Sequence, residues 1–237
     1  MTEYKTAAVL ACAGSGNRMK GSCADKLLYD EGGTPVAAYA LMAYDKTEGI
    51  DLLVIVTQRD LVPVYQSFKE KYEIQKNVIV TVGGASRMES VLNGVRAVPE
   101  EYTFVAIGDG ARPLIHPKEI RATLESAWKN GAAALGVHLT DTVKEVDGDQ
   151  IVKTIPREAL VGIQTPQVFQ RVEYLDLAAR AAETGENFTD DASIYEYYGK
   201  KVAFVEGSRY NMKITLPEDL VIFRAMLEVQ NEDRTRL

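Results

Sequence analysis

The sequence predicts an α/β protein built on one doubly wound, mostly parallel, Rossmann-like sheet with a protruding β-hairpin arm. Short apolar runs of strand length alternate along the chain with stretches whose apolar residues recur at helical spacing. Glycine-rich turns follow several of these runs, at the positions where open parallel sheets bind ligands. The 237 residues suit a single α/β domain, so we expect one domain over residues 1–237.

Each predicted element follows from a local pattern of residues. Strands are expected where β-branched, aromatic or small apolar residues cluster, over residues 6–11, 52–57, 78–82, 102–107, 132–137 and 201–206. Helices are expected over residues 36–44, 61–72, 86–97, 117–128, 172–183, 190–198 and 217–229. Pro35 stands where the first helix can begin, and Ser86 with Glu89 matches a capping box. The polar residues 231–237 are expected to fray.

The alternation of strands and helices changes at His138. Residues 138–146 and 150–155 alternate polar and β-branched residues about a turn at Asp147-Gly148-Asp149, which predicts a β-hairpin. A hairpin standing alone is only marginally stable, so it needs either the body of the protein or a second subunit as a partner. We assign this arm to about residues 138–160.

Charge and composition exclude several classes of function. The net charge of −7 argues against generic nucleic-acid binding, because that binding favours a basic surface. No run approaches the ~20 apolar residues that span a bilayer, and no signal-peptide pattern opens the chain, so we expect a cytoplasmic protein without membrane partners. Cys12 and Cys23 lack metal-site spacing and are expected to be reduced. His116 and His138 come without a nucleophile motif.

Four unusual clusters are expected at the edge of the sheet where open parallel sheets bind ligands. They are Gly14-Ser15-Gly16-Asn17-Arg18, Gly83-Gly84-Ala85-Ser86-Arg87, Gly108-Asp109-Gly110-Ala111-Arg112 and Gln164-Thr165-Pro166-Gln167. Small residues let backbone N–H groups approach an anion, and arginine and lysine side chains suit phosphate oxygens. A carboxylate such as Asp109, at the end of a buried strand, can hold Mg²⁺ on a triphosphate. Each cluster alone also fits an ordinary turn or a surface salt bridge, so single motifs leave the function open.

Together the motifs resemble the 2-C-methyl-D-erythritol 4-phosphate cytidylyltransferase family, the CTP-dependent enzymes of the non-mevalonate isoprenoid pathway. The likeness runs from about residue 6 to residue 227 and rests on the order and spacing of the motifs. They are Ala13-Gly14-Ser15-Gly16-Asn17-Arg18-Met19, Gly83-Gly84-Ala85-Ser86-Arg87-Met88-Glu89-Ser90-Val91, Asp109-Gly110-Ala111-Arg112-Pro113, Asp141-Thr142-Val143-Lys144, Gln164-Thr165-Pro166-Gln167, Thr189-Asp190-Asp191-Ala192 and Asn211-Met212-Lys213-Ile214-Thr215-Leu216-Pro217-Glu218-Asp219-Leu220. The resemblance implies the nucleotide-diphospho-sugar transferase type of sheet, and transfer of CMP from CTP to a sugar-alcohol phosphate with release of pyrophosphate.

The resemblance also implies a role for each matching position. Nucleotide-binding residues would be Cys12, Ala13, Gly14, Gly16, Gly83, Ala85, Ser90, Asp109, Gly110 and Thr165, with Asp109 holding Mg²⁺ or another divalent cation. Catalytic cations would be Arg18, Lys26, Arg157 and Lys213. The acceptor site would be lined by Arg112, Thr140, Thr189 and Lys213, with Arg157 arriving from the arm of a second subunit in a homodimer.

Two positions depart from the family pattern, and other functions stay open. Gly108 stands where the family usually has histidine, and Asp25 precedes Lys26 where a proline is common. These departures keep open a non-catalytic nucleotide-binding homologue, and the shared motifs keep open a ribitol 5-phosphate cytidylyltransferase. A nicotinamide-dependent dehydrogenase is disfavoured, because the first loop lacks a third glycine and Thr57 replaces the expected acidic residue.

Overall fold

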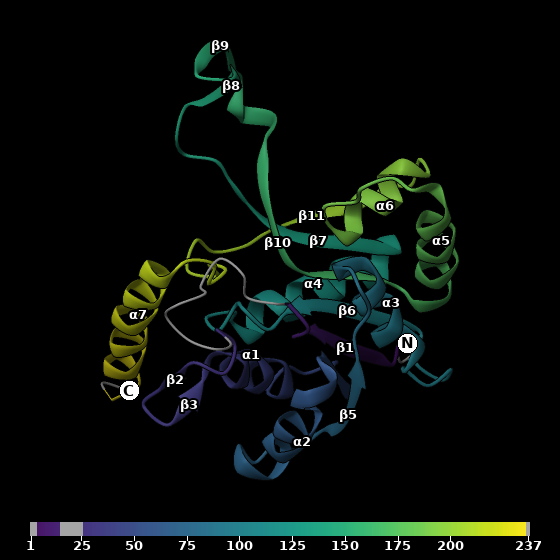
Figure 1. The fold of residues 1–237 in the computed structure, drawn as a ribbon, viewed down its shortest axis with the longest axis vertical. Helices are drawn as coiled ribbons and strands as arrows, with labels where there is room; N and C mark the ends of the chain where they lie inside the picture. The colour runs from purple at the N-terminus through teal and green to yellow at the C-terminus, as the bar shows by residue number, and fades with distance from the viewer. Residues whose placement is uncertain (1–3, 15–25, 236–237) are drawn as a thin grey trace.

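A seven-stranded sheet runs through the computed structural model, which describes residues 4–14 and 26–235 (Figure 1). Its strands, in spatial order, are β11 (Ala203–Glu206), β7 (Ala132–His138), β10 (Val161–Gln170), β6 (Phe104–Asp109), β1 (Thr6–Ala11), β4 (Leu52–Thr57) and β5 (Asn77–Val82). Neighbouring strands are parallel except β10, which is antiparallel to both β6 and β7. The mostly parallel α/β sheet predicted from the sequence is confirmed.

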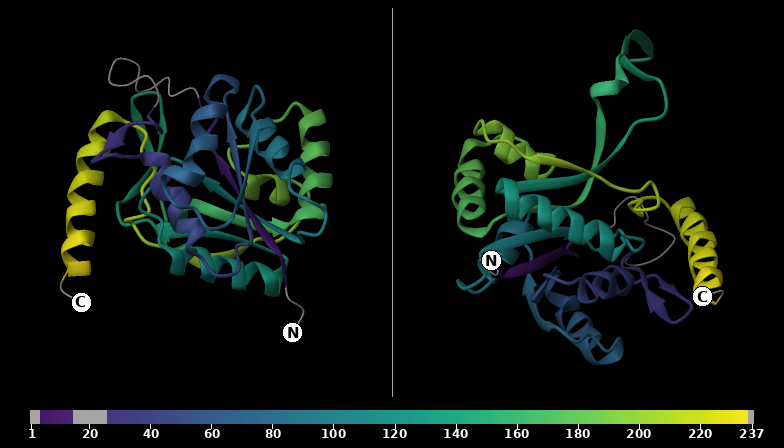
Figure 2. Two further views of the ribbon diagram at one scale, coloured as in Figure 1. Left: turned by 90° about the horizontal axis from the view of Figure 1, so that it is seen from below. Right: turned by 180° about the vertical axis from the view of Figure 1, so that it is seen from behind.

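Helices cover both faces of this sheet (Figure 2). The side chains that face one cluster of core residues come from α1 (Val36–Asp45), α2 (Val62–Lys71), α4 (Pro117–Asn130) and α7 (Pro217–Thr235). The opposite cluster holds side chains of α3 (Arg87–Arg96), α5 (Arg171–Thr184) and α6 (Asp191–Tyr197). Along β1, Ala8 and Leu10 join the first cluster while Ala7 and Val9 join the second, as the two-residue period of a strand requires.

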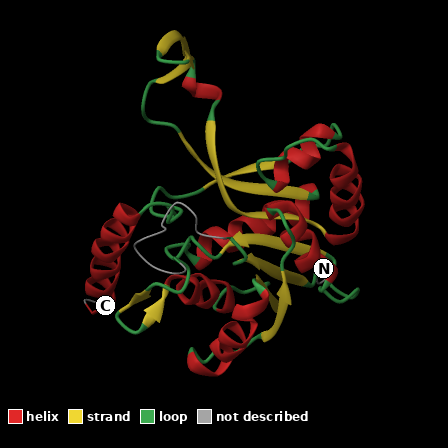
Figure 3. Cartoon of the chain, viewed as in Figure 1, coloured by secondary structure: helices red, strands yellow, loops and turns green. Residues whose placement is uncertain are grey.

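The arm consists of β8 (Val143–Asp147) paired with β9 (Gln150–Ile155), followed by the short 3₁₀ helix η3 (Arg157–Ala159). It projects away from the sheet and its helices (Figure 3). Both strands are almost wholly exposed, including Val146, Ile151 and Val152, each more than half accessible to solvent. The hairpin begins at residue 143 rather than at His138 as predicted, because residues 132–138 belong to β7, where His138 pairs with Val161.

The observed elements differ from the predicted ones in further places. Strand β10 was not predicted, because Gly162, Pro166 and its glutamines break the apolar pattern of a buried strand, and its pairing with β7 shifts register between Ile163 and Gln167. Helix α7 extends to Thr235, where fraying was expected. A short hairpin of β2 (Asp30–Glu31) and β3 (Thr34–Pro35) and the 3₁₀ turn η2 (Arg59–Leu61) also had no counterpart among the predicted elements.

The carboxyl ends of the parallel strands meet at one edge of the sheet. Ala11 is paired with Asp109 on one side and with Val56 on the other, and Thr57 is paired with Val82. The loops that follow β1, β5 and β6 therefore open onto the same region. None of the helices in the described part of the chain is long and apolar enough to cross a bilayer.

Helix α3 approaches the sheet closely at Gly94, and this contact yields a test of the packing. A Cβ atom at Gly94 would lie 2.5 Å from a methyl carbon of Val9 and 2.5 Å from one of Val56. We expect Gly94→Val to lower the free energy of unfolding by about 1–3 kcal/mol, because the extra methyl groups overpack this interface. Chemical denaturation measures the effect, and Arg96→Ala, on the exposed side of α3, is the control. Equal stability of the two variants would contradict the close packing.

Candidate active site

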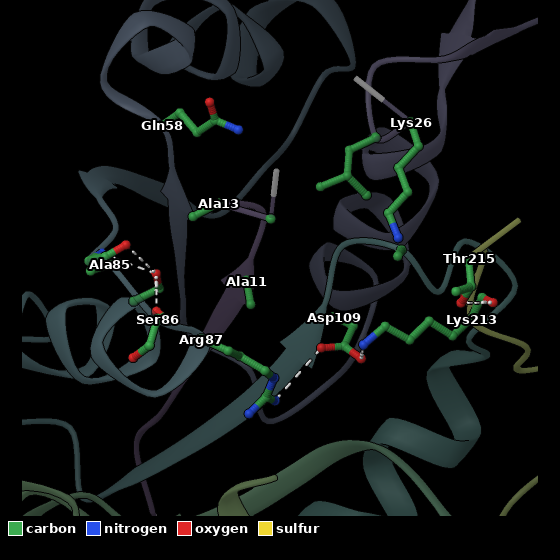
Figure 4. Close-up of a pocket in the computed structure, with 15 residues that line it drawn as sticks. Ala11, Ala13, Lys26, Gln58, Ala85, Ser86, Arg87, Asp109, Lys213 and Thr215 are labelled. Carbon is green, nitrogen blue, oxygen red and sulfur yellow. Dashed lines mark hydrogen bonds and ion pairs between the residues drawn. The ribbon is translucent and has the colours of Figure 1, made fainter. Parts of the chain in front are cut away.

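A cavity of about 610 Å³ lies at the carboxyl ends of β1, β5 and β6 (Figure 4). It is lined by Ala11, Ala13, Gly14, Lys26, Leu27, Gln58, Gly84, Ala85, Ser86, Arg87, Ser90, Asp109, Ala111, Lys213 and Thr215. A second cavity of about 430 Å³ adjoins it, lined by Arg87, Asp109, Arg112, Ile163, Gln164, Thr165, Gln167, Thr189, Asp190, Ser193, Glu196 and Lys213. The two cavities share Arg87, Asp109 and Lys213, so these three charged side chains form the junction between them.

Asp109 is the centre of this junction. Strand β6 delivers it from a fully buried run, and its backbone N–H donates to Thr165 Oγ1 at 3.0 Å. Lys213 Nζ lies 2.9 Å and Arg112 Nε 3.6 Å from Asp109 Oδ2, while Arg87 lies 3.7 Å from Oδ1. Burial raises the pKa of Asp109, but the three cations outweigh it and hold the pKa below its ordinary value. The carboxylate is therefore charged at neutral pH.

Arg87 belongs to a second, more deeply buried set of contacts. Its guanidinium lies 2.8 Å from Asp191 Oδ2, and the hydroxyl of Tyr174 donates to Asp191 Oδ1 at 2.7 Å. Asp191 is 1% exposed and Tyr174 is fully buried. Burial and the neighbouring carboxylate raise the pKa of Tyr174 well above its ordinary value, so the hydroxyl keeps its proton. The sequence analysis gave none of the three a role, although Arg87 and Asp191 lie in named motifs and Tyr174 in a predicted helix, because the contacts join α3, α5 and α6.

The segment before α7 fixes two lysines at the first cavity. Asn211 is fully buried, and its amide donates to Gln164 Oε1 at 3.0 Å and to the carbonyl of Thr165 at 3.1 Å. Its own carbonyl accepts from Arg112 at 2.6 Å. Two residues later Lys213 reaches Asp109, and the carbonyl of Ile214 accepts from Lys26 Nζ at 2.9 Å. Asn211 is a further residue to which the sequence analysis gave no role, although it lies in the motif that begins at that position.

The loop before α3 forms one wall of the first cavity. Ser86 Oγ accepts from the N–H of Glu89 at 3.1 Å, as the predicted capping box requires, but the carboxylate of Glu89 accepts from Ala85 rather than from Ser86. Ser90 Oγ accepts from the N–H of Gly84 at 3.0 Å. A Cβ at Gly83 would lie 2.7 Å from both Ala13 Cβ and Ser90 Oγ, so glycine lets the loops after β1 and β5 touch.

The departure at Gly108 has a structural explanation. A Cβ atom there would lie 2.7 Å from Cζ of Tyr44 and 2.9 Å from Cδ2 of Leu10. The buried ring of Tyr44, from α1, thus occupies the space beside Asp109 that a larger residue at position 108 would need. The other departure, Asp25, lies outside the described residues.

The structure brings most of the predicted site residues to the two cavities. Those that line one or both are Ala13, Gly14, Lys26, Ala85, Ser90, Asp109, Arg112, Thr165, Thr189 and Lys213. Gly83, Cys12 and Gly110 are not among the lining residues of either cavity. Cys12 and Gly110 lie against each other, because a Cβ atom at Gly110 would be 2.5 Å from the sulfur of Cys12. Gly16 and Arg18 lie outside the described residues, as does Cys23.

Two predicted residues lie elsewhere in the chain. Thr140 and Arg157 are exposed at the base of the arm, where Arg157 donates to the carbonyl of Thr140, and neither lines a cavity of its own chain. Both histidines also lie outside the site. His116 caps α4 through Nδ1, which accepts from the N–H of Lys118 at 3.1 Å, and His138 lies 3.4 Å from Glu206.

A divalent cation at this site would depend on Asp109. No group of three or more His, Cys, Asp or Glu side chains with the spacing of a metal site occurs among the described residues. A single ionised carboxylate beside a cavity that Lys26, Arg87 and Lys213 line fits Mg²⁺, which typically takes one or two carboxylates and completes its coordination with substrate phosphates and water.

Comparison with known proteins agrees with this geometry. Residues 6–229 match the family model described as 2-C-methyl-D-erythritol 4-phosphate cytidylyltransferase. Proteins of that name from Halalkalibacterium halodurans and Bacillus mycoides are 38% and 36% identical, covering 92% and 94% of this chain and 95% and 98% of their own. The crystal structure of a 4-diphosphocytidyl-2C-methyl-D-erythritol synthase from Anaerococcus prevotii superposes with a TM-score of 0.85 at 28% identity, covering 95% of this chain and 97% of that one. The chain belongs to the 2-C-methyl-D-erythritol 4-phosphate cytidylyltransferase family.

Proposed function

We propose that the protein transfers the cytidylyl group of CTP to 2-C-methyl-D-erythritol 4-phosphate, forming 4-diphosphocytidyl-2-C-methyl-D-erythritol and pyrophosphate. The observation that supports it most directly is the meeting of two cavities at a charged junction in a member of this family. The larger cavity suits the nucleotide, because glycine and alanine backbone line it. The smaller one suits a polyol phosphate, because it combines cations with amide, hydroxyl and carboxylate groups.

The chemistry needs charge stabilisation more than proton transfer. The nucleophile is an oxygen of a phosphate monoester whose second pKa is about 6, so it is already an anion at neutral pH. It attacks the α-phosphorus of CTP, and the bond to the bridging oxygen of pyrophosphate breaks. An acceptor that is already ionised needs no general base to remove a proton before it attacks.

In the proposed mechanism, lysine and arginine side chains provide most of the charge stabilisation. Lys26 lines the first cavity, while Lys213 and Arg112 lie beside Asp109. Fixed cations that surround the transferring phosphoryl group stabilise the charge that develops there. Arg18 is assigned to the same group on the family resemblance. A magnesium ion held by Asp109 and the nucleotide would neutralise part of the triphosphate charge.

We further propose a homodimer in which the arm completes the neighbouring acceptor site. Three exposed apolar side chains on the arm, and the position of Thr140 and Arg157 away from the cavities of their own chain, support this arrangement. The partner subunit's Arg157 would then add a cation to the acceptor cavity. A cytoplasmic location is part of the proposal, because both substrates are phosphorylated metabolites that do not cross membranes unaided.

Pyrophosphate release tests the proposed reaction. We expect turnover when the protein, CTP and Mg²⁺ are combined with 2-C-methyl-D-erythritol 4-phosphate, and loss of turnover when EDTA removes the metal.

Lys26→Ala is expected to lower kcat on the order of 10²–10³-fold in the same assay, as loss of a preorganised electrostatic group does. Turnover with ribitol 5-phosphate alone would replace the acceptor in this proposal, and CTP binding without any turnover would identify a non-catalytic homologue.

Asn211 provides a test of how the lysines are held. We expect Asn211→Ala to lower kcat at least tenfold, because Lys213 and the carbonyl that anchors Lys26 lie within three residues of it. The change also removes two buried hydrogen bonds, so unfolding free energy should fall by about 1–3 kcal/mol. Thr123→Val is the control, because it removes the hydrogen bond that the hydroxyl of the buried Thr123 donates to the carbonyl of Glu119 in α4. If both variants lose stability and both keep full turnover, Asn211 has no positioning role.

Subunit mixing tests the proposed dimer. Arg157→Ala and Lys213→Ala should each be nearly inactive alone, since each removes one cation from every site. Co-expressed in equal amounts, they should regain about a quarter of wild-type activity, because half of the dimers are mixed and each mixed dimer has one intact site. Size-exclusion chromatography with light scattering checks the dimer itself. Absence of any recovery in purified mixed dimers would exclude the shared site.

A further inference from the structure

Arg87 stands at the junction of the two cavities, and the family resemblance gives it no role. We propose that Arg87 is a catalytic residue whose guanidinium contacts the phosphate groups where nucleotide and acceptor meet, and that Asp191 and Tyr174 are positioning residues that hold it there. The inference rests on the function proposed above and extends it to a cation supplied by α3.

The position of Arg87 is the first argument. Its side chain is one-third exposed and lines both cavities, a property it shares only with Asp109 and Lys213 among the described residues. Arg87 and Lys213 approach Asp109 from opposite sides (Figure 4), at Oδ1 and Oδ2 respectively. A phosphate that bridges the two cavities would therefore meet a cation on each flank of the carboxylate.

The charge balance at the junction is the second argument. Three cationic side chains, those of Arg87, Arg112 and Lys213, lie within 3.7 Å of the Asp109 carboxylate, and Arg87 also pairs with Asp191. Asp190 and Glu196 line the second cavity, but among the described residues neither forms an ion pair with these three cations. The cations repel one another across the narrow space around one carboxylate. A doubly charged phosphate relieves that repulsion, so the junction is a better site for an anion than a simple structural ion pair would be.

The buried contacts behind Arg87 are the third argument. Asp191 Oδ2 accepts from Arg87, while Asp191 Oδ1 is occupied by the hydroxyl of Tyr174. Tyr174 packs against Phe169 and lines neither cavity. A carboxylate fixed by one donor orients the guanidinium plane that it binds with its other oxygen, and orientation matters for a planar five-donor group. Asp191 and Tyr174 thus orient the guanidinium of Arg87, and neither of them lines a cavity.

In the reaction, a P–O bond forms between the acceptor phosphate and the α-phosphorus of CTP. The bond from that phosphorus to the bridging oxygen breaks, and its electron pair leaves with pyrophosphate. Both phosphates enter as anions, so no proton moves. Arg87 would neutralise negative charge on the non-bridging oxygens as the two anions approach each other.

The test compares Arg87→Gln, Arg87→Lys and Tyr174→Phe with Arg180→Gln. Arg180 is the matched control, because it also pairs with an aspartate, Asp176 at 3.3 Å, but lies on the exposed side of α5. Arg87→Gln should lower kcat/KM on the order of 10²–10³-fold. Arg87→Lys should recover part of that loss, because it keeps the charge and loses the fork. Tyr174→Phe should lower kcat several-fold with little change in the KM for CTP, and Arg180→Gln should match the wild type.

Two further measurements separate the possible failures. Thermal unfolding shows whether each variant is folded at the assay temperature: Arg87→Gln that is folded and within about threefold of wild-type kcat/KM overturns the proposal. A lower Tm in both Arg87 variants with unchanged kcat would identify a purely structural link between α3 and α6, which also overturns it. If the wild type lacks turnover, the proposed function fails on its own. Calorimetric titration with CTP and Mg²⁺ then decides for Arg87: weaker binding in Arg87→Gln than in Arg180→Gln supports the contact, and equal binding overturns it.

Discussion

The attraction between one buried carboxylate, that of Asp109, and the cations around it determines how the site is arranged. The three cations come from α3, from the loop after β6 and from the segment before α7, so the chain alone does not bring them together. Without the carboxylate their mutual repulsion would be unopposed at this point, although Asp191 and the carbonyl of Asn211 also hold Arg87 and Arg112. Asp109 therefore keeps a cluster of positive charge assembled before any phosphate arrives. Such preorganisation matters because a catalyst that need not reorient its charges during the reaction stabilises the transition state more effectively.

Side-chain contacts among α3, α5 and α6 join the walls of the two cavities. Ala85, Ser86 and Ser90 line the first cavity, and they lie in α3 or just before it. Thr189 and Ser193 line the second cavity, and they lie just before α6 and in its first turn. The Arg87–Asp191 ion pair ties these two helix starts together, and α5 supports it through Tyr174. A shift of either helix start would change both cavities, so in the proposed function this ion pair would link nucleotide binding to acceptor binding.

Sequence reasoning predicted the parts of this arrangement that depend on local patterns. Strands β1 and β4 follow from uninterrupted apolar runs, and their predicted bounds match those observed. Strand β10 could not be predicted in this way, because Gln167 inside it is stabilised by distant groups: its amide accepts from the N–H of Ala192 and donates to Asp190, both at 2.8 Å. The same holds for Arg87, whose partner Asp191 is 104 residues away, and for Gly108, whose neighbour Tyr44 belongs to α1. Local sequence patterns do not show which distant side chains will be paired in the folded protein, and each of these features depends on such a pairing.

The two cavities differ in how much of their wall a single chain supplies. The nucleotide cavity is bounded by the loops after β1, β5 and β6 and by the Lys213 segment, all from the body of one chain. The acceptor cavity lies beside the strand, β10, that leads back from the arm, and the arm carries Arg157 and Thr140 away from it. In the proposed dimer the nucleotide would thus bind a largely preformed site, whereas the acceptor would need the neighbouring arm. The cation from the neighbouring arm would then act on the acceptor side of the site, while the cations around the CTP phosphates come from the chain that binds the nucleotide.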